Sequence, residues 1–104
     1  GELKSMSQEE RLMYYAENDI EEFISLFQEM YPQFHENLIE IHPNLTDSEL
    51  ELCYMTFLDI PTKDIAFLSK IELRSVQTKR SRLRKKINLQ PEVDFAEYLK
   101  SLSN

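Results

Sequence analysis

Glycine is almost absent from this chain of 104 residues, whose single glycine is the first residue. Tight turns between strands depend on residues that accept a positive φ, and glycine is the main source of them. An all-β or α/β fold is therefore disfavoured. We expect an all-α fold in which short helices are joined by polar loops, with one modest core.

Cysteine occurs once, at Cys53, which excludes an internal disulfide. A lone cysteine is typical of a reducing compartment, and we expect a cytoplasmic protein. Its place on an apolar stripe predicts a small buried hydrophobic residue. No apolar run approaches the roughly eighteen residues that a membrane span requires, so we expect no membrane contact by this fragment.

Positive charge is scarce except in one segment of the chain. Seven of the twelve lysine and arginine residues lie between positions 74 and 86, a stretch that contains no acid. Residues 63–86 carry nine bases and two acids, a balance of +7, although the whole chain has a net charge of −7. A basic run alone is usually a solvated helix face. A segment this polarised favours a surface that faces a polyanion.

The N-terminal part predicts one long helix. Residues 7–10 read as a capping box, and apolar residues then recur at spacings of three and four over the seam Met13–Met30, before Pro32 ends the helix. Two interpretations of this seam remain open. It covers the core of its own domain, or it is a coiled-coil stub that pairs two subunits through residues such as Ile20 and Phe27.

Shorter helices are predicted in the rest of the chain. A proline that opens a helix, capping residues and apolar spacing place them at 32–41, 46–58, 63–69, 74–87 and 91–102, the last of them beginning at Pro91. We assign residues 1–44 to an N-terminal helical segment, a linker or coiled-coil-like extension packing on the domain, and residues 45–104 to that domain. The absence of an initiating methionine leads us to expect a fragment of a longer protein.

The basic segment 74–87 is amphipathic. At 100° per residue, Leu83 and Ile87 each lie within about 20° of Val76, which predicts a buried stripe. The opposite face presents polar side chains that can form hydrogen bonds with base edges. These are Arg74, Gln77, Thr78, Ser81 and Lys85.

Three blocks of residues resemble the LuxR-type (GerE-type) DNA-binding domain, which reads L-T-x-x-E, N-K-E-I-A and T-V-K-x-H-x-x-x-I-x-x-K-L. At matching separations this chain has Leu45-Thr46-x-x-Glu49, Thr62-Lys63-Asp64-Ile65-Ala66, and Ser75-Val76-x-Thr78 followed by Leu83-x-x-Lys86-Ile87. It departs from the family pattern at Asp59, Ser69 and Lys79. With Tyr31-Pro32 and His42-Pro43 ahead of these blocks, the chain is similar to the variant found as the C-terminal tail of large multidomain bacterial regulators.

The resemblance implies a tetrahelical helix-turn-helix bundle, preceded by a long N-terminal helix and a short helix. It implies a transcriptional regulator output domain that binds double-stranded DNA as a homodimer, controlled by an upstream sensor or regulatory domain of the same polypeptide. The base-reading residues would be Gln77, Thr78 and Ser81, aided by Arg74 and Lys85. The phosphate-binding residues would be Thr62, Lys63, Lys79, Arg82 and Arg84. The last helix would supply the dimer contacts Phe95, Leu99 and Leu102.

No motif in the chain indicates catalysis. Because nucleophile–base pairs, a P-loop and a dinucleotide fingerprint are all missing, we expect no enzyme activity, no cofactor and no small-molecule substrate. His35 and His42 stand seven residues apart without a cysteine pair, so we expect no metal site.

Arg80 lies on the anchor side of its helix, where its stem is expected to pack while its guanidinium extends into solvent. The alternative function, from another class, is a helical protein–protein interaction module of a signalling protein that does not read DNA. Such a module would have no affinity for duplex DNA even at low salt.

Overall fold

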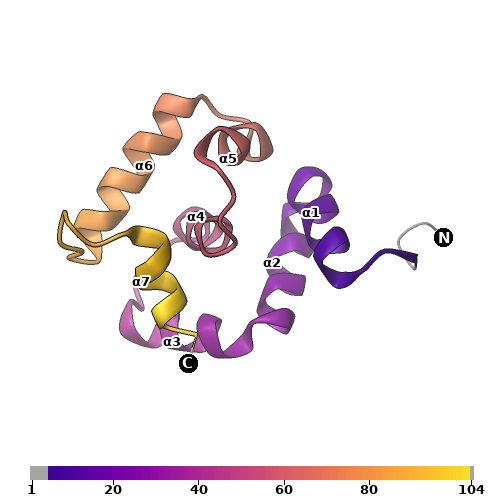
Figure 1. Ribbon diagram of the computed structural model, residues 1–104, viewed down its shortest axis with the longest axis horizontal. Helices are drawn as coiled ribbons and strands as arrows, with labels where there is room; N and C mark the ends of the chain where they lie inside the picture. The colour runs from indigo at the N-terminus through magenta and orange to yellow at the C-terminus, as the bar shows by residue number, and fades with distance from the viewer. Residues whose placement is uncertain (1–4, 104) are drawn as a thin grey trace. The chain divides into compact units, whose positions relative to one another are not determined.

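The computed structural model describes residues 5–103, and in that range it contains seven α-helices and no strand (Figure 1). The prediction of an all-α fold is confirmed. None of the described helices is long and apolar enough to cross a bilayer. The chain divides into two compact units, Gly1–Pro32 and Gln33–Asn104. The helices are α1 (Gln8–Asn18), α2 (Ile20–Met30), α3 (Pro32–Ile41), α4 (Asp47–Phe57), α5 (Thr62–Ser69), α6 (Leu73–Lys86) and α7 (Phe95–Ser101).

The N-terminal unit contains two packed helices where the apolar spacing predicts one. The prediction of a continuous helix is wrong, because Asp19 (φ −156°) ends α1 and caps α2. Its side chain accepts a hydrogen bond from the backbone N–H of Glu22 at 3.3 Å. Aspartate stabilises a helix start more than a helix interior, so this local cap interrupts the periodic pattern.

The break also interrupts the predicted seam. Met13 is 42% exposed, whereas its neighbour Leu12 is buried. Phe23 and Phe27 of α2 are buried and their rings lie 6.2 Å apart. The buried residues of α1 and α2 therefore do not form one uninterrupted heptad stripe.

The C-terminal unit is built around α4. Residues 52–55 of this helix are all buried, which requires packing on every side of it. Figure 1 shows α4 nearly end-on, with α5, α6 and α7 beside it, and α4 contacts both α6 and α7. Cys53 is fully buried, as predicted, and burial, with the nearby charge of Glu49, raises its pKa to about 12. A thiol in this environment stays protonated and serves as a packing group.

Helix α3 belongs to the C-terminal unit. The ring of Phe34 stacks on Phe57 at a centroid distance of 4.3 Å. His42 and Tyr98 form a hydrogen bond of 2.6 Å between Nε2 and the hydroxyl, which joins the end of α3 to α7. His35 makes a similar bond of 2.8 Å with Tyr54 of α4. The compact unit thus begins at residue 33, whereas the sequence places the start of its domain at residue 45.

The last helix begins later than predicted. Residues 91–93 form turns, and α7 starts at Phe95 with Asp94 as its N-cap. The carboxylate of Asp94 accepts a hydrogen bond from the N–H of Glu97 at 2.9 Å. The prediction that Pro91 opens this helix is therefore wrong, because the aspartate cap determines the start of the helix.

Candidate nucleic-acid interface

Helix α6 is held in the C-terminal unit by one apolar stripe. Val76, Leu83 and Ile87, the residue that caps the helix, are 1%, 0% and 8% exposed. These are the three residues that the helical wheel predicts as the anchor, so that prediction is confirmed. Because the anchored face is fixed, the orientation of the remaining faces of α6 follows from the 100° step between residues.

The opposite face of α6 is open to solvent. Its residues are polar or cationic, and none of them is buried or half-buried. A helix that reads DNA needs this division, with one face packed and the other free to enter the major groove. The exposed residues are the five predicted to contact bases, namely Arg74, Gln77, Thr78, Ser81 and Lys85.

A tight turn connects α5 to α6. Lys70, which caps α5, has a φ of 58°, in the left-handed region, and the N–H of Ile71 donates to the carbonyl of Ala66 at 3.1 Å. This is the hydrogen-bond pattern of a Schellman turn, which here is made without glycine. Asp59, at a position where many members of the resembled family have glycine, also has a left-handed φ of 60°. The backbone at this position therefore has the conformation that glycine adopts most easily.

Two lysines connect one flank of α6 to the start of α4. Lys79 donates a hydrogen bond to the hydroxyl of Ser48. Lys86 forms an ion pair with Glu49 at 2.7 Å. Burial of the Glu49 carboxylate favours its neutral form, but the hydrogen bonds from Lys86 and Thr46 and the charge of Lys86 outweigh burial, so the pKa of Glu49 is lowered. Both lysines therefore bind this flank of α6 to the N-terminal end of α4.

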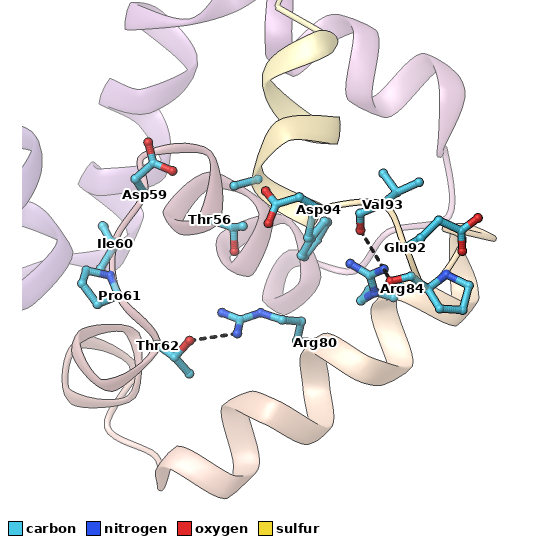
Figure 2. A pocket seen from close by; sticks show the side chains of 13 residues that line it. Thr56, Asp59, Ile60, Pro61, Thr62, Arg80, Arg84, Glu92, Val93 and Asp94 are labelled. Atoms are coloured by element: carbon cyan, nitrogen blue, oxygen red, sulfur yellow. Dashed lines mark hydrogen bonds between the residues drawn. The ribbon is translucent and has the colours of Figure 1, made fainter.

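Two arginines line the other flank (Figure 2). The guanidinium of Arg84 donates to three backbone carbonyls of the segment before α7, at 2.8 Å to Gln90, 3.3 Å to Pro91 and 2.9 Å to Val93. Arg80 donates from Nη1 to the hydroxyl of Thr62 at 2.8 Å. Its guanidinium is therefore half-buried and bonded within the unit, whereas the sequence predicts that it extends into solvent.

These contacts divide the predicted phosphate-binding residues into two groups. Lys63 and Arg82 are exposed. Thr62, Lys79 and Arg84 each form hydrogen bonds within the unit. Arg84 makes the most hydrogen bonds of the three, and its guanidinium holds the 90–93 segment in place.

The predicted dimer contacts are mostly inside the chain. Phe95 is 4% exposed, and both Leu99 and Phe27 are fully buried. Leu102 and Ile20 are half-buried. Only these last two retain surface that a second subunit can contact in the structure described.

Replacing Arg84 with glutamine is expected to lower the free energy of unfolding by about 1.5 kcal/mol, because charge-assisted hydrogen bonds contribute about that much when partly solvated. Arg82→Gln removes the same charge from an exposed position of the same helix and is expected to change stability by less than about 0.5 kcal/mol. Urea denaturation of both variants provides the measurement. Equal effects would contradict the structural role of Arg84.

The flank with Arg80 and Arg84 has one feature that the sequence does not predict. A cleft of about 530 Å³ opens between the start of α5, the middle of α6 and the segment before α7. Its residues come from four separate stretches of the chain, so no local pattern indicates it. The position of Arg80 on the anchor side of its helix is the one sequence signal that points towards it.

The chain matches no protein-family model, no curated protein and no solved structure. Support for a function therefore comes from the geometry of α5, α6 and the residues around them. Among residues 5–103, no group of three or more histidine, cysteine or acidic side chains is arranged to hold a metal ion.

Proposed function

We propose that the C-terminal unit binds double-stranded DNA, with α5 and α6 acting as a helix-turn-helix and α6 entering the major groove. The observation that supports this most is the exposed face of α6, where polar and cationic side chains stand opposite the buried stripe of Val76, Leu83 and Ile87. A helix fixed in this way presents its side chains to a groove without moving. The proposal agrees with the resemblance of residues 45–89 to LuxR-type domains.

Sequence recognition is proposed for the first two turns of α6. The amide of Gln77 can form two hydrogen bonds with adenine, and the methyl group of Thr78 can contact the methyl of thymine. Ser81 lies one turn further along the same exposed face. Arg74 and Lys85, at the two ends of this face, would add contacts to guanine or to phosphates.

Affinity and register are proposed to come from phosphate contacts. Lys63 at the start of α5 and Arg82 on α6 are exposed. Lys79 would exchange its hydrogen bond with Ser48 for a phosphate. Thr62 lies beside Lys63, although its hydroxyl already accepts a bond from Arg80. Arg84 is left out of this set, because three carbonyls already occupy its guanidinium.

Regulation is proposed to act through the assembly of subunits. The resembled family binds DNA as a dimer under the control of an upstream domain, so we propose that this unit is the output domain of a bacterial transcriptional regulator. Leu102 and Ile20 retain part of their surface for a subunit contact, whereas Phe95, Leu99 and Phe27 are buried. Of the dimer contacts that the resemblance implies, Leu102 is therefore the one with surface left for a second subunit.

Gln77→Ala is expected to weaken binding at a selected DNA site by about 2 kcal/mol and to relax the preference at one base position. The reason is that a bidentate contact to one base is lost while all phosphate contacts remain. A site is first selected from a random duplex pool, and fluorescence anisotropy then compares that site with its single-base variants.

Arg82→Ala is the matched control, because it removes a phosphate contact from the same helix. It is expected to weaken binding to all duplexes by a similar factor. If Gln77→Ala also reduced binding uniformly across sequences, the base-reading role of Gln77 would be wrong.

One observation favours the alternative of a protein-interaction module. Phe67 on α5 is 68% exposed, and Leu73 at the start of α6 is 45% exposed. Both lie near the turn between the two helices. Exposed aromatic residues are typical anchors of protein interfaces. A folded sample that does not bind duplex DNA even at low salt would support this second function.

A further inference from the structure

The cleft beside α6 is a polar site inside the C-terminal unit. Figure 2 shows Arg80 and Thr62 on one side of it and the segment before α7 on the other. Thr56 of α4 and the N-terminal end of α5 also line it. With a volume of about 530 Å³, it is large enough to hold a small molecule.

Arg80 contributes a positive charge without a counterion. Its guanidinium is half-buried and has one protein partner, the hydroxyl of Thr62. The ion pairs found among residues 5–103 are Lys86 with Glu49 and Lys100 with Asp59, so neither Arg80 nor Arg84 is paired with a carboxylate. Burial, and then the repulsion from Arg84, lower the pKa of Arg80. A bound anion would favour the charged form of Arg80 and so oppose both effects on its pKa.

Thr56 provides an independent sign of a missing partner. The side chain is 8% exposed, and its hydroxyl oxygen is buried without any hydrogen bond in the structure. Figure 2 shows this hydroxyl directed to the side of the cleft where Arg80 lies. Buried polar groups normally have a partner, and one that lacks it indicates a site for a ligand.

The start of α5 supplies further donors. Pro61 is the N-cap, and no side chain caps the helix. The first N–H groups of a helix have no acceptor within the helix, and they favour a negative charge. Because Pro61 and Thr62 both line the cleft, these groups lie at the same place as the hydroxyl of Thr62.

The acids around the cleft define the kind of anion that fits. Asp59, Glu92 and Asp94 are exposed. Asp59 is paired with Lys100, and Asp94 accepts the N–H that caps α7. Carboxylates at the rim repel an extended polyanion, while a compact anion can pass them and reach the guanidinium of Arg80.

We propose that this cleft binds a small molecule through an oxyanion group, a carboxylate or a phosphate. Arg80 and the first N–H groups of α5 bind the anion, and the hydroxyl of Thr56 donates a further hydrogen bond. Because the ligand links α5 to α6, its binding fixes the geometry of the two helices. This inference does not depend on DNA binding by the same unit.

The test is a titration of the full chain with inorganic phosphate and, separately, with acetate, followed by ¹H–¹⁵N correlation spectra at constant ionic strength. We expect saturable shifts of the amides of Thr62 and Lys63 and of the side-chain Nε–H of Arg80. Arg80→Gln keeps a donor for Thr62 but removes the charge, and it is expected to weaken binding about tenfold or more. Lys70→Gln, which removes a positive charge from an exposed position outside the cleft, is expected to leave the affinity unchanged.

Thr56→Val is a second variant, in which weaker binding could not be attributed to loss of the folded state. Removing a buried hydroxyl without a partner is expected to raise the Tm of the free protein, while binding of phosphate becomes weaker. Signals that shift without saturation, or equal losses in Arg80→Gln and Lys70→Gln, would overturn the proposal.

Duplex DNA serves as the third probe, because its backbone carries the same phosphate chemistry. If the cleft binds a small molecule, DNA is expected neither to shift the Thr62 and Arg80 signals in the same way nor to compete with phosphate for the cleft. Competition would overturn the small-molecule assignment and assign the site to the DNA backbone. If the protein did not bind DNA at all, the phosphate titration would still give its own result.

Discussion

Raising the salt concentration from about 50 to about 200 mM is expected to weaken the binding of duplex DNA about fortyfold for each bound subunit. Each phosphate neutralised by a lysine or arginine releases condensed counterions, which lowers the slope of log K against log salt by about 0.9. With Lys63, Lys79 and Arg82 as contacts, the slope is expected to be about −2.7. A dimer on two half-sites would double it.

The net charge of −7 is compatible with this proposed binding. The field at a protein surface is screened over about 8 Å in physiological salt, so the basic residues of α6 act locally. We therefore expect the charges of the C-terminal unit nearest to α6 to govern the affinity for duplex DNA.

Variants that each lack one positive charge show which residues contribute to this salt dependence. Lys63→Gln and Arg82→Gln are each expected to reduce the magnitude of the slope by about 0.9, while Arg84→Gln leaves it unchanged. Fluorescence anisotropy with a labelled random duplex pool at several salt concentrations measures the slope. A folded sample with no binding at the lowest salt, or a slope that none of the variants alters, would contradict DNA binding through α6.

Local signals in the sequence predict most of the helix boundaries. Both capping boxes are present, with Ser7 and Glu10 at α1 and with Thr46 and Glu49 at α4. Such caps involve residues three positions apart, so the sequence contains all the information they need. The break at Asp19 is also local, but the apolar spacing continues across it. Periodicity alone therefore predicts one helix where a cap makes two.

Other features depend on contacts between distant residues. The segment before α7 is held by Arg84, and this contact is not visible in the spacing of residues 91–102. The cleft combines Arg80 with Thr62, eighteen positions earlier, and with Thr56 of α4. In contrast, the exposed face of α6 follows from the helical step and three apolar residues. The candidate DNA surface was therefore predictable from sequence, whereas the cleft required the tertiary structure.

Among the differences between the sequence-based prediction and the structure, the position of α3 has the largest expected effect on the free energy of unfolding. The sequence-based assignment places residues 32–41 in the N-terminal segment 1–44, which packs on a domain that starts at residue 45. In the structure, Phe34 is 1% exposed and its ring stacks on Phe57, with an edge contact to Tyr54 at 6.4 Å. The short segment between α3 and α4 thus connects two helices of one core.

Phe34→Ala is expected to lower the free energy of unfolding by about 4 kcal/mol, because it removes a buried aromatic ring and leaves a cavity. Ile39→Ala on the same helix is the matched control. Ile39 is 39% exposed, and its loss is expected to cost less than about 1 kcal/mol. Urea denaturation of the full chain, with equal m-values required for the comparison, measures both. If α3 were only a linker, the two variants would have similarly small effects, and the C-terminal unit would begin after residue 44.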